Sequence, residues 1–394
     1  MKKPLIITGA VLITILLVVV WLYLLLFGTP DDQAEIFANL QLSDEPVPRP
    51  ELPEPEPEAA IADVVDTQSA ALNQLTTRSV AGFVLAELDG RLTARYVEQG
   101  TGHIYDIDLE SGTEVRTSGT TVGEAVKAVF SSNGQHVAVA RGATGAWQWQ
   151  HAPIGTSSEL RLRELPARAE NLALSDDGNI RYTITTTITT GYIYEVATGQ
   201  TAPLFTVPLR DITVHWADNA TYLSNRPAPY LRGGLYRYDN DVLKAITAFD
   251  FGLTADVVGD WIITSRYNTD LTSYESYLFD KGDSNNIRFA TTVIPEKCAG
   301  VQRSTSSPPQ LWCAAPPESD GRLYVRNWYQ GVNQNDDLLW EIDPTTGTSE
   351  VLVDFISELG YGLDVANLSV SADGSTLGFI NRHNNTLWVY YPNR

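Results

Sequence analysis

The sequence predicts an all-β domain of about seven four-stranded repeats, and three observations lead to this prediction. The 394-residue chain has 18 Tyr and 9 Trp but one Met, and aromatic side chains suit the pleated, half-buried surface of strands. Turns of Asp-Gly or Asn-Gly type recur at a regular spacing, and aromatic strands recur between them. Four short strands in each 41 to 44 residues is the arithmetic of a β-propeller blade.

The first 28 residues predict a membrane anchor. No charged residue occurs from Pro4 to Pro30, and such a stretch is long enough to cross a hydrocarbon core of about 30 Å. Small residues in an A-x-A cleavage pattern do not follow it, so we expect the anchor to stay uncleaved. Lys2 and Lys3 precede the span and the next basic residue is Arg49, which predicts a cytoplasmic N-terminus and an extracytoplasmic remainder.

Residues 29–77 predict an acidic, Pro-rich linker. The segment SDEPVPRPELPEPEPEAA alternates Pro with Glu, and residues 29–77 carry eleven acids against one Arg. Such a composition cannot bury a core and favours an extended spacer, with an acidic binding motif as the alternative. Near its end, Leu72 and Leu75 belong to a run of apolar residues near helical spacing, which predicts a short helix.

Seven turns define the repeat of the predicted propeller, residues 78–394. Each turn separates an apolar strand from a second strand, and Gly suits it because type I′ turns need positive φ. The first three turns are 44 residues apart, and the fourth and fifth are 41 apart. The turns are Asp89-Gly90, Asn133-Gly134, Asp177-Gly178, Asp218-Asn219, Gly259-Asp260, Asp320-Gly321 and Asp373-Gly374.

An aromatic third strand follows in six repeats. The segments GHIYDIDLESG, GYIYEVATG, GLYRYDND, SYLFDKGD, LLWEIDPTTG and TLWVYYP begin at residues 102, 191, 234, 276, 338 and 386. Blades are therefore expected to start near Val80, Ala125, Asn171, Asp211, Ala255, Glu296 and Ala366. The last repeat has only three clear strands, so a strand from before residue 90 is expected to close the ring and cover its edges. The spacing leaves six or eight blades as alternatives.

The two cysteines predict a disulfide in the sixth repeat. Cys298 and Cys313 would close a 16-residue loop, and an oxidising compartment permits the bond. Two buried thiols are the alternative. A bridge of this span contributes about 3 kcal/mol on the chain-entropy estimate.

The segments FSSNGQHVAVA, LSDDGNIRYTI and VSADGSTLGFI resemble the apolar-Ser-x-Asp-Gly hairpin of WD40-like, TolB-type β-propeller repeats. With the anchor and linker, the chain more narrowly resembles uncharacterised membrane-anchored propeller proteins of bacteria. The resemblance covers about 315 residues and implies a fold rather than an activity. TolB-type proteins carry an α/β domain where this chain has its linker, so a role in the TolB envelope system is not expected.

Several kinds of chemistry are not expected. The net charge of −21 argues against nucleic-acid binding, which needs clustered Lys and Arg. No G-x-S-x-G elbow of a fused hydrolase occurs, and no Cys/His spacing predicts a metal or cofactor. Five histidines lie without ligand spacing and are expected to be turn or surface residues: His103, His136, His151, His215 and His383.

Arginine recurs in or just after the predicted second strand of six repeats. Repeat symmetry would bring these residues to one face of the disc, where they could bind an anionic ligand or partner. The alternative, which we favour, is that each pairs with an acid of a third strand, such as Asp106, Glu195, Asp280 or Glu341, and ties blades together. The six are Arg95, Arg141, Arg226, Arg266, Arg326 and Arg382.

These features predict a single-pass membrane protein with an extracytoplasmic propeller. We interpret it as a non-enzymatic protein-binding or scaffold module of the cell envelope, whose partner is another envelope protein or a peptide. The alternative is an envelope hydrolase acting on glycans or peptides in the propeller funnel. Convergent carboxylates in the funnel would favour the enzyme, and a basic or aromatic rim would favour binding.

Overall fold

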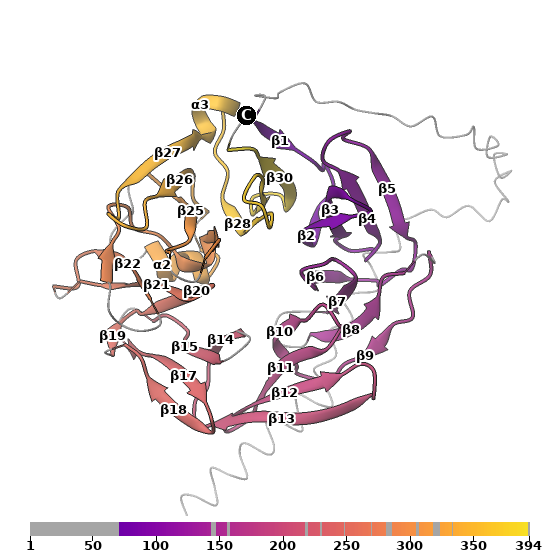
Figure 1. Cartoon of the computed structure of the whole chain (residues 1–394), viewed down its shortest axis with the longest axis horizontal. Coiled ribbons are helices and arrows are strands. Elements are labelled where there is room, and N and C mark those ends of the chain that lie inside the picture. Colours follow the sequence, from indigo (N-terminus) through magenta and orange to yellow (C-terminus); the bar gives the residue numbers. More distant parts are fainter. Residues whose placement is uncertain are drawn as a thin grey trace, which may run out of the picture. The chain divides into compact units, whose positions relative to one another are not determined.

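Seven four-stranded antiparallel sheets are arranged radially around one axis (Figure 1). The computed structural model describes residues 71–142, 147–155, 158–216, 220–228, 231–247, 249–268, 270–280, 286–304, 307–317, 324–332 and 334–392. These residues belong to one compact unit, Val65–Arg394. The predicted all-β, seven-bladed propeller is therefore confirmed.

Each blade lists its strands from the axis outward. Blades one to three are β2 (Val80–Leu88), β3 (Arg91–Glu98), β4 (Ile104–Asp108) and β5 (Glu114–Ser118); β6 (Ala125–Phe130), β7 (His136–Arg141), β8 (Gln148–Pro153) and β9 (Arg163–Glu164); and β10 (Glu170–Leu174), β11 (Ile180–Thr185), β12 (Thr189–Glu195) and β13 (Gln200–Val207). Blades four and five are β14 (Ile212–Trp216), β15 (Thr221–Asn225), β17 (Leu235–Asp239) and β18 (Val242–Ala245); and β20 (Thr254–Val258), β21 (Trp261–Tyr267), β22 (Tyr274–Asp280) and β23 (Asn286–Arg288). Blades six and seven are β24 (Cys298–Val301), β25 (Gln310–Ala315), β26 (Leu338–Ile342) and β27 (Ser349–Asp354); and β28 (Val365–Val370), β29 (Leu377–Asn381), β30 (Thr386–Tyr390) and β1 (Leu72–Gln74).

Glycine turns set the repeat, as the sequence predicts. Gly90 and Gly134 have φ of 75° and 68°, which only glycine adopts without strain, and they join the first and second strands of blades one and two. All seven innermost strands begin within two residues of their predicted starts. Asp218-Asn219 lies partly or wholly outside the described residues, as does Asp320-Gly321.

Strand β1 closes the ring, because it is the outermost strand of blade seven and pairs antiparallel with β30 (Figure 1). Leu72 lies opposite Tyr390 and is 1% exposed. The predicted closing strand is thus confirmed, but the predicted short helix is wrong at Leu72 and Leu75. Pairing with a waiting strand edge outweighs local apolar spacing here. The propeller therefore begins before the predicted boundary at residue 78.

Blade six departs from the predicted repeat. Its first two strands are joined by residues 302–309, so Asp320-Gly321 is not its first turn and falls between its second and third strands instead. The same connection contains helix α2 (Tyr324–Tyr329). Arg326 therefore lies on a helix and not on a second strand. The apolar residues Tyr324 and Val325 are buried, and this packing favours a helical turn over a strand.

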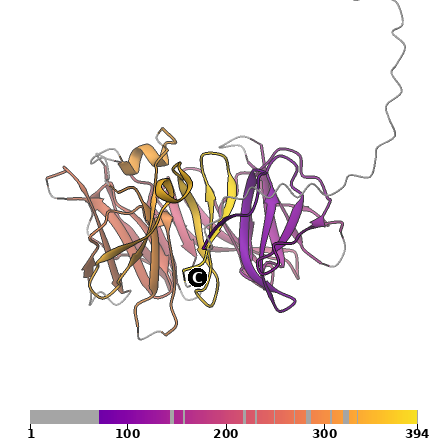
Figure 2. The ribbon, with the colours of Figure 1, turned by 90° about the horizontal axis from the view of Figure 1, so that it is seen from above.

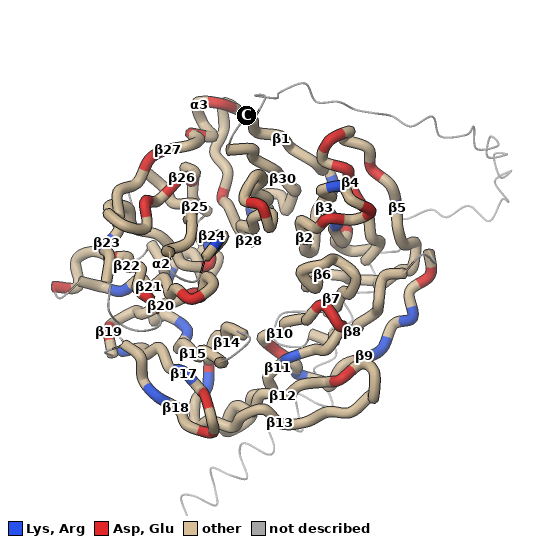
Figure 3. The backbone as a smooth tube through the Cα atoms, viewed as in Figure 1, with Lys and Arg blue, Asp and Glu red and all other residues tan. Residues whose placement is uncertain are grey.

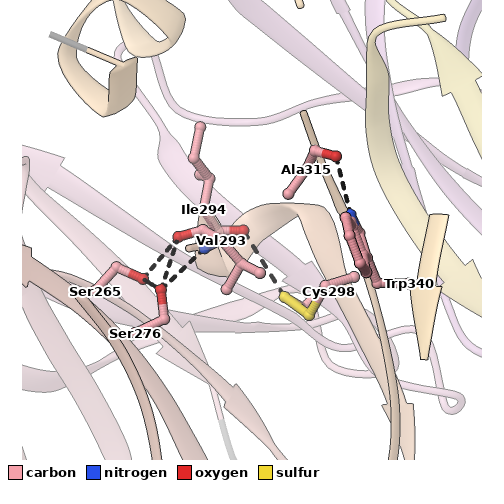
Figure 4. Close-up of a disulfide and its surroundings, with 8 residues drawn as sticks. Ser265, Ser276, Val293, Ile294, Cys298, Ala315 and Trp340 are labelled. Atoms are coloured by element: carbon pink, nitrogen blue, oxygen red, sulfur yellow. Dashed lines mark hydrogen bonds between the residues drawn. A yellow bond between two sulfur atoms is a disulfide. The ribbon is translucent and has the colours of Figure 1, made fainter. Parts of the chain in front are cut away.

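The predicted disulfide is confirmed in blade six. Cys298 on β24 lies directly opposite Cys313 on β25, and their sulfur atoms are bonded. A short 3-10 helix, η2 (Pro295–Lys297), leads into Cys298. Figure 4 shows the bridge near Val293, whose carbonyl accepts a hydrogen bond from Ser265. The bond therefore joins two strands that already pair, inside the core between blades five and six.

The hydrophobic core lies between neighbouring blades. Val97 and Ile104 of blade one pack against Val137 and Val139 of blade two, and similar clusters fill the other interfaces. A two-stranded ribbon, β16 (Arg232–Gly233) with β19 (Asp250–Phe251), and helix α3 (Phe355–Leu359) are the additions to the blades among the described residues. Each blade thus depends on both neighbours.

Connections between second and third strands share one face of the disc, which we call the rim face; α2 lies on it (Figure 2). The Asp-Gly turns lie on the opposite face. The predicted anchor (1–28) and most of the predicted linker (29–77) fall outside the described residues. Among the residues from 71 onward that the structure describes, no helix has the length and apolarity needed to span a membrane.

Candidate functional site

The six predicted arginines do not form a ring. Lys and Arg positions are scattered among the blades rather than gathered around the axis (Figure 3). Arg95 and Arg266 are held in ion pairs with acids, and Arg141 lies 3.8 Å from Glu164. Arg382 donates a hydrogen bond to the Trp328 carbonyl at 2.9 Å. Two of the six, Arg226 and Arg326, share one pocket.

Arg95 ties blade one to blade two, as the favoured alternative predicts. It binds Asp106 through two hydrogen bonds of 2.6 and 2.7 Å and donates a third to the carbonyl of Gly134. Arg266 is paired with Asp250 rather than with the expected Asp280, and it lies over the Tyr277 ring. Both guanidinium groups are therefore occupied by their own fold.

A pocket on the rim face brings Arg226 and Arg326 together from blade four and helix α2. Its volume is about 570 Å³, within the usual range for small-molecule sites. Arg226 lies 4.0 Å from Glu170, and both side chains are largely exposed, so this pair is weak. Arg326 contacts Gln330 at 3.2 Å, and no acid among the described residues pairs with it. The pocket is lined by Thr213, Arg226, Pro227, Ala228, Arg326, Tyr329 and Gln330.

Lys127 adds a third cation near Arg226. It lies on β6, the innermost strand of blade two, and its ammonium group sits 5.6 Å from the centre of the Trp147 ring. The side chain is open to solvent although protein surrounds it, as expected on the wall of a channel. Burial and then the positive charge of Arg226 lower the pKa of Lys127. Like charges held together in an acidic chain favour an anionic ligand.

Helix α2 roofs the pocket because its aromatic residues bond to two other blades. The Tyr329 hydroxyl lies 2.8 Å from Oγ1 of Thr254 in blade five. The Trp328 indole donates to Asp364 of blade seven at 3.2 Å, and Arg382 stacks on the same ring. The helix is thereby fixed over the inner ends of blades five to seven.

Glu296 lies under this roof, at the entry to blade six. Burial raises the pKa of its carboxyl to about 7, although a hydrogen bond from Tyr329 opposes the shift. Its Oε2 is buried and meets no hydrogen-bond partner among the described residues. The charge of Asp256 raises the pKa further. A carboxyl kept in such surroundings costs stability, which is typical of functional groups.

His215 and Asp256 join the same region from blades four and five. His215 Nδ1 lies 3.0 Å from Asp256 Oδ1, and the His215 side chain is 9% exposed. Burial lowers the pKa of His215, but the hydrogen bond and charge of Asp256 outweigh it, so the pKa lies above its usual value. His215 is thus not a surface or turn residue, and neither is His151, which is 1% exposed.

Glu296→Gln is expected to stabilise the propeller at pH 8 by about 2 kcal/mol. Because the folded-state pKa of Glu296 is raised, its contribution is fully present below pH 4.5 and is lost as the pH rises to about 7. The neutral amide avoids this loss, and partial exposure keeps the gain below the full value of the shift. Urea unfolding at pH 4.5 and pH 8 measures it.

The exposed Glu350 on β27 provides the control for this prediction. Glu350→Gln should change stability by less than about 0.5 kcal/mol at both pH values. An equal effect of Glu296→Gln at pH 4.5 and pH 8 would show that the Glu296 carboxyl does not titrate between them.

No group of three or more His, Cys, Asp or Glu among the described residues is arranged to hold a metal ion. The site therefore has to be understood from cations, carboxylates and hydroxyl groups of the chain itself. It can bind negative charge at Lys127, Arg226 and Arg326, and it can exchange protons at Glu296 and His215.

Sequence reasoning found two of the site residues and missed the others. Lys127, His215, Asp256 and Glu296 come from four blades, so no local spacing connects them. A usable signal exists, because all four lie within four residues of a predicted blade start. The first residues of innermost strands line the axis of a propeller, so polar residues there are site candidates.

Comparisons with known proteins agree with the fold. No protein-family model matches the chain, and neither does any curated protein. The β-propeller domain of the Trilobed protease from Pyrococcus furiosus is similar, with a TM-score of 0.50 and 11% identity over 78% of this chain and 95% of that one. That propeller is described as having an open velcro topology, whereas β1 closes this one.

Two oligogalacturonate lyase structures are also similar. The enzyme from Vibrio parahaemolyticus has a TM-score of 0.54 and 11% identity over 81% of this chain and 93% of its own. A lyase in complex with manganese has a TM-score of 0.55 and 11% identity over 83% and 94%. At this identity the likeness shows the fold alone. The chain is thus a seven-bladed β-propeller whose similarity to solved structures ends at the fold.

Proposed function

We propose that this protein is a binding module that takes anionic ligands at the rim-face pocket. The single observation that carries the proposal is the convergence of Lys127, Arg226 and Arg326, none of which is neutralised by a close, buried acid among the described residues. Arginine suits carboxylates because its planar donors form two parallel hydrogen bonds. Tyr329 and Gln330 add neutral donors at the same wall.

The partner is an acidic segment of another protein, and the pocket receives its carboxylate side chains. The charge pattern of the first 28 residues supports a membrane anchor that presents the propeller outside the cytoplasm. The module would then act in the cell envelope, where the acidic linker spaces it from the membrane. The hydrolase alternative gains support from Asp256 and Glu296, which converge from neighbouring blades beside His215.

Arg226→Gln combined with Arg326→Gln is expected to weaken binding of an acidic peptide by about 100-fold. Each lost charge-assisted bond is worth about 1.5 kcal/mol, or roughly tenfold. Fluorescence anisotropy with fluorescein-labelled hexaglutamate measures the affinity, which should also fall as salt rises from 50 to 300 mM because charges at the pocket are partly exposed.

The matched control replaces two exposed arginines away from the pocket, Arg91→Gln and Arg288→Gln. This variant loses the same net charge, so it separates a local site from general attraction. Equal weakening in both double variants, or equal affinity for hexalysine, would contradict the proposal.

A further inference from the structure

Three residues on neighbouring strands form a hydrogen-bonded chain beside the pocket. Ser224 Oγ lies 3.3 Å from Nε2 of His215, and His215 Nδ1 lies 3.0 Å from Oδ1 of Asp256. Asp256 is itself fixed, because the same oxygen accepts a hydrogen bond from the Val257 amide at 2.7 Å. A carboxylate on Nδ1 holds the imidazole so that Nε2 faces the serine hydroxyl, the arrangement that activates a serine nucleophile.

The strands place this chain at the pocket wall. Ser224 on β15 lies directly opposite Thr213 on β14, and Thr213 lines the pocket. Arg226, two residues after Ser224, lines it as well. His215 lies on the same side of β14 as Thr213, because strand residues alternate between faces. Ser224 is 2% exposed, so its hydroxyl is shielded from bulk water but adjoins the ligand site.

The next blade shows what a purely structural serine does at the same register. Ser265 on β21 lies opposite Thr254, as Ser224 lies opposite Thr213. Its hydroxyl is used up by Ser276 and by the carbonyl of Val293, at 2.8 and 2.7 Å. Blade four instead presents a histidine at this point, and that histidine is oriented by an acid.

We propose that Ser224, His215 and Asp256 hydrolyse an ester or amide whose substituent carries a negative charge. The inference rests on the proposed function, because Lys127 and Arg326 would recognise that charge. Ser224 Oγ bonds to the acyl carbon while its proton passes to His215 Nε2, and Arg226 stabilises the oxyanion. His215 then protonates the leaving alcohol or amine as its bond to the acyl carbon breaks.

Water completes the cycle. His215 removes a proton from water, which attacks the acyl group on Ser224, and the carboxylic acid leaves as the serine recovers its proton. The net change is one ester or amide plus one water giving one acid and one alcohol or amine. Asp256 stays ionised throughout and stabilises the imidazolium.

Covalent labelling of the full-length chain in detergent micelles tests the nucleophile. Di-isopropyl fluorophosphate should phosphorylate Ser224, located by peptide mass spectrometry, with the rate rising through a pKa above 6.5. The groups that face His215 are Asp256, Ser224 and Glu296, and burial opposes the two acids that raise its pKa. Ser224→Ala and His215→Gln should slow labelling by roughly 1,000-fold. Ser265→Ala is the matched control and should label at the wild-type rate.

Ester hydrolysis tests the substrate class. The wild-type chain should hydrolyse p-nitrophenyl hydrogen succinate roughly tenfold better than neutral p-nitrophenyl butyrate, and Arg326→Gln should reduce that preference. Absence of label on Ser224 in the folded wild-type chain, or hydrolysis that survives in Ser224→Ala, overturns the inference. Hexaglutamate binding that persists without labelling would leave the binding function standing while the hydrolytic inference falls.

Discussion

Replacing Lys297 with methionine is expected to lower the free energy of unfolding by about 4 kcal/mol. The Lys297 ammonium group lies 2.6 Å from Asp337 and 2.6 Å from Asp364, and all three side chains are fully buried. Removing the cation leaves two carboxylates without a counter-charge in a medium that solvates them poorly. Urea unfolding at pH 7 measures the loss.

The pH dependence makes this prediction sharper. Burial, reinforced by Asp364, raises the pKa of Asp337 to about 6 even beside Lys297. A carboxyl with a raised folded-state pKa stabilises the fold when protonated and loses this contribution as the pH rises. Lys297→Met should therefore be more damaging at pH 8 than at pH 5. The exposed Lys244 on β18 is the control, and Lys244→Met should cost less than about 0.5 kcal/mol at either pH. Equal losses at pH 5 and pH 8 would contradict the buried triad.

Removing β1 is expected to destabilise the propeller by about 5 kcal/mol. A chain that begins at residue 78 loses Leu72, whose burial is worth about 2 kcal/mol, and several hydrogen bonds worth about 1 kcal/mol each. These include the bonds from Leu75 N to the Leu387 carbonyl and from Leu387 N to Thr76 Oγ1. The uncovered edge of β30 should also promote aggregation.

The comparison chain begins at residue 65 and keeps β1. Urea midpoints measure stability, and sedimentation measures aggregation. Leu72→Ala in the longer chain should cost about 3 kcal/mol, between the two truncated forms. Equal midpoints for chains beginning at 65 and 78 would show that the ring does not depend on its closing strand.

The repeat could be predicted because glycine geometry is local. Positive φ at Gly90 and Gly134 is written into the residue type, so the turns mark the strands that flank them. The same holds for Arg95 and Asp106, which face each other across paired strands at a register that the hairpin sets. Elements whose cause lies within one blade were accessible from the sequence.

Elements whose cause lies in another blade were not accessible in this way. Leu72 and Leu75 have helical spacing, yet β1 is a strand because β30 offers it an edge. Arg326 lies in a segment that reads as a strand, yet Trp328 and Tyr329 find partners in blades seven and five that favour a helix. The site combines residues from blades two, four, five and six, which only ring closure brings together.

The crystal structure of the full-length chain with hexaglutamate tests the central claim most directly. We expect peptide carboxylates in the rim-face pocket, within 3.2 Å of the guanidinium groups of Arg226 and Arg326, a normal hydrogen-bond distance. Peptide bound on the opposite face, or at the outer strands with the pocket empty, would contradict the claim.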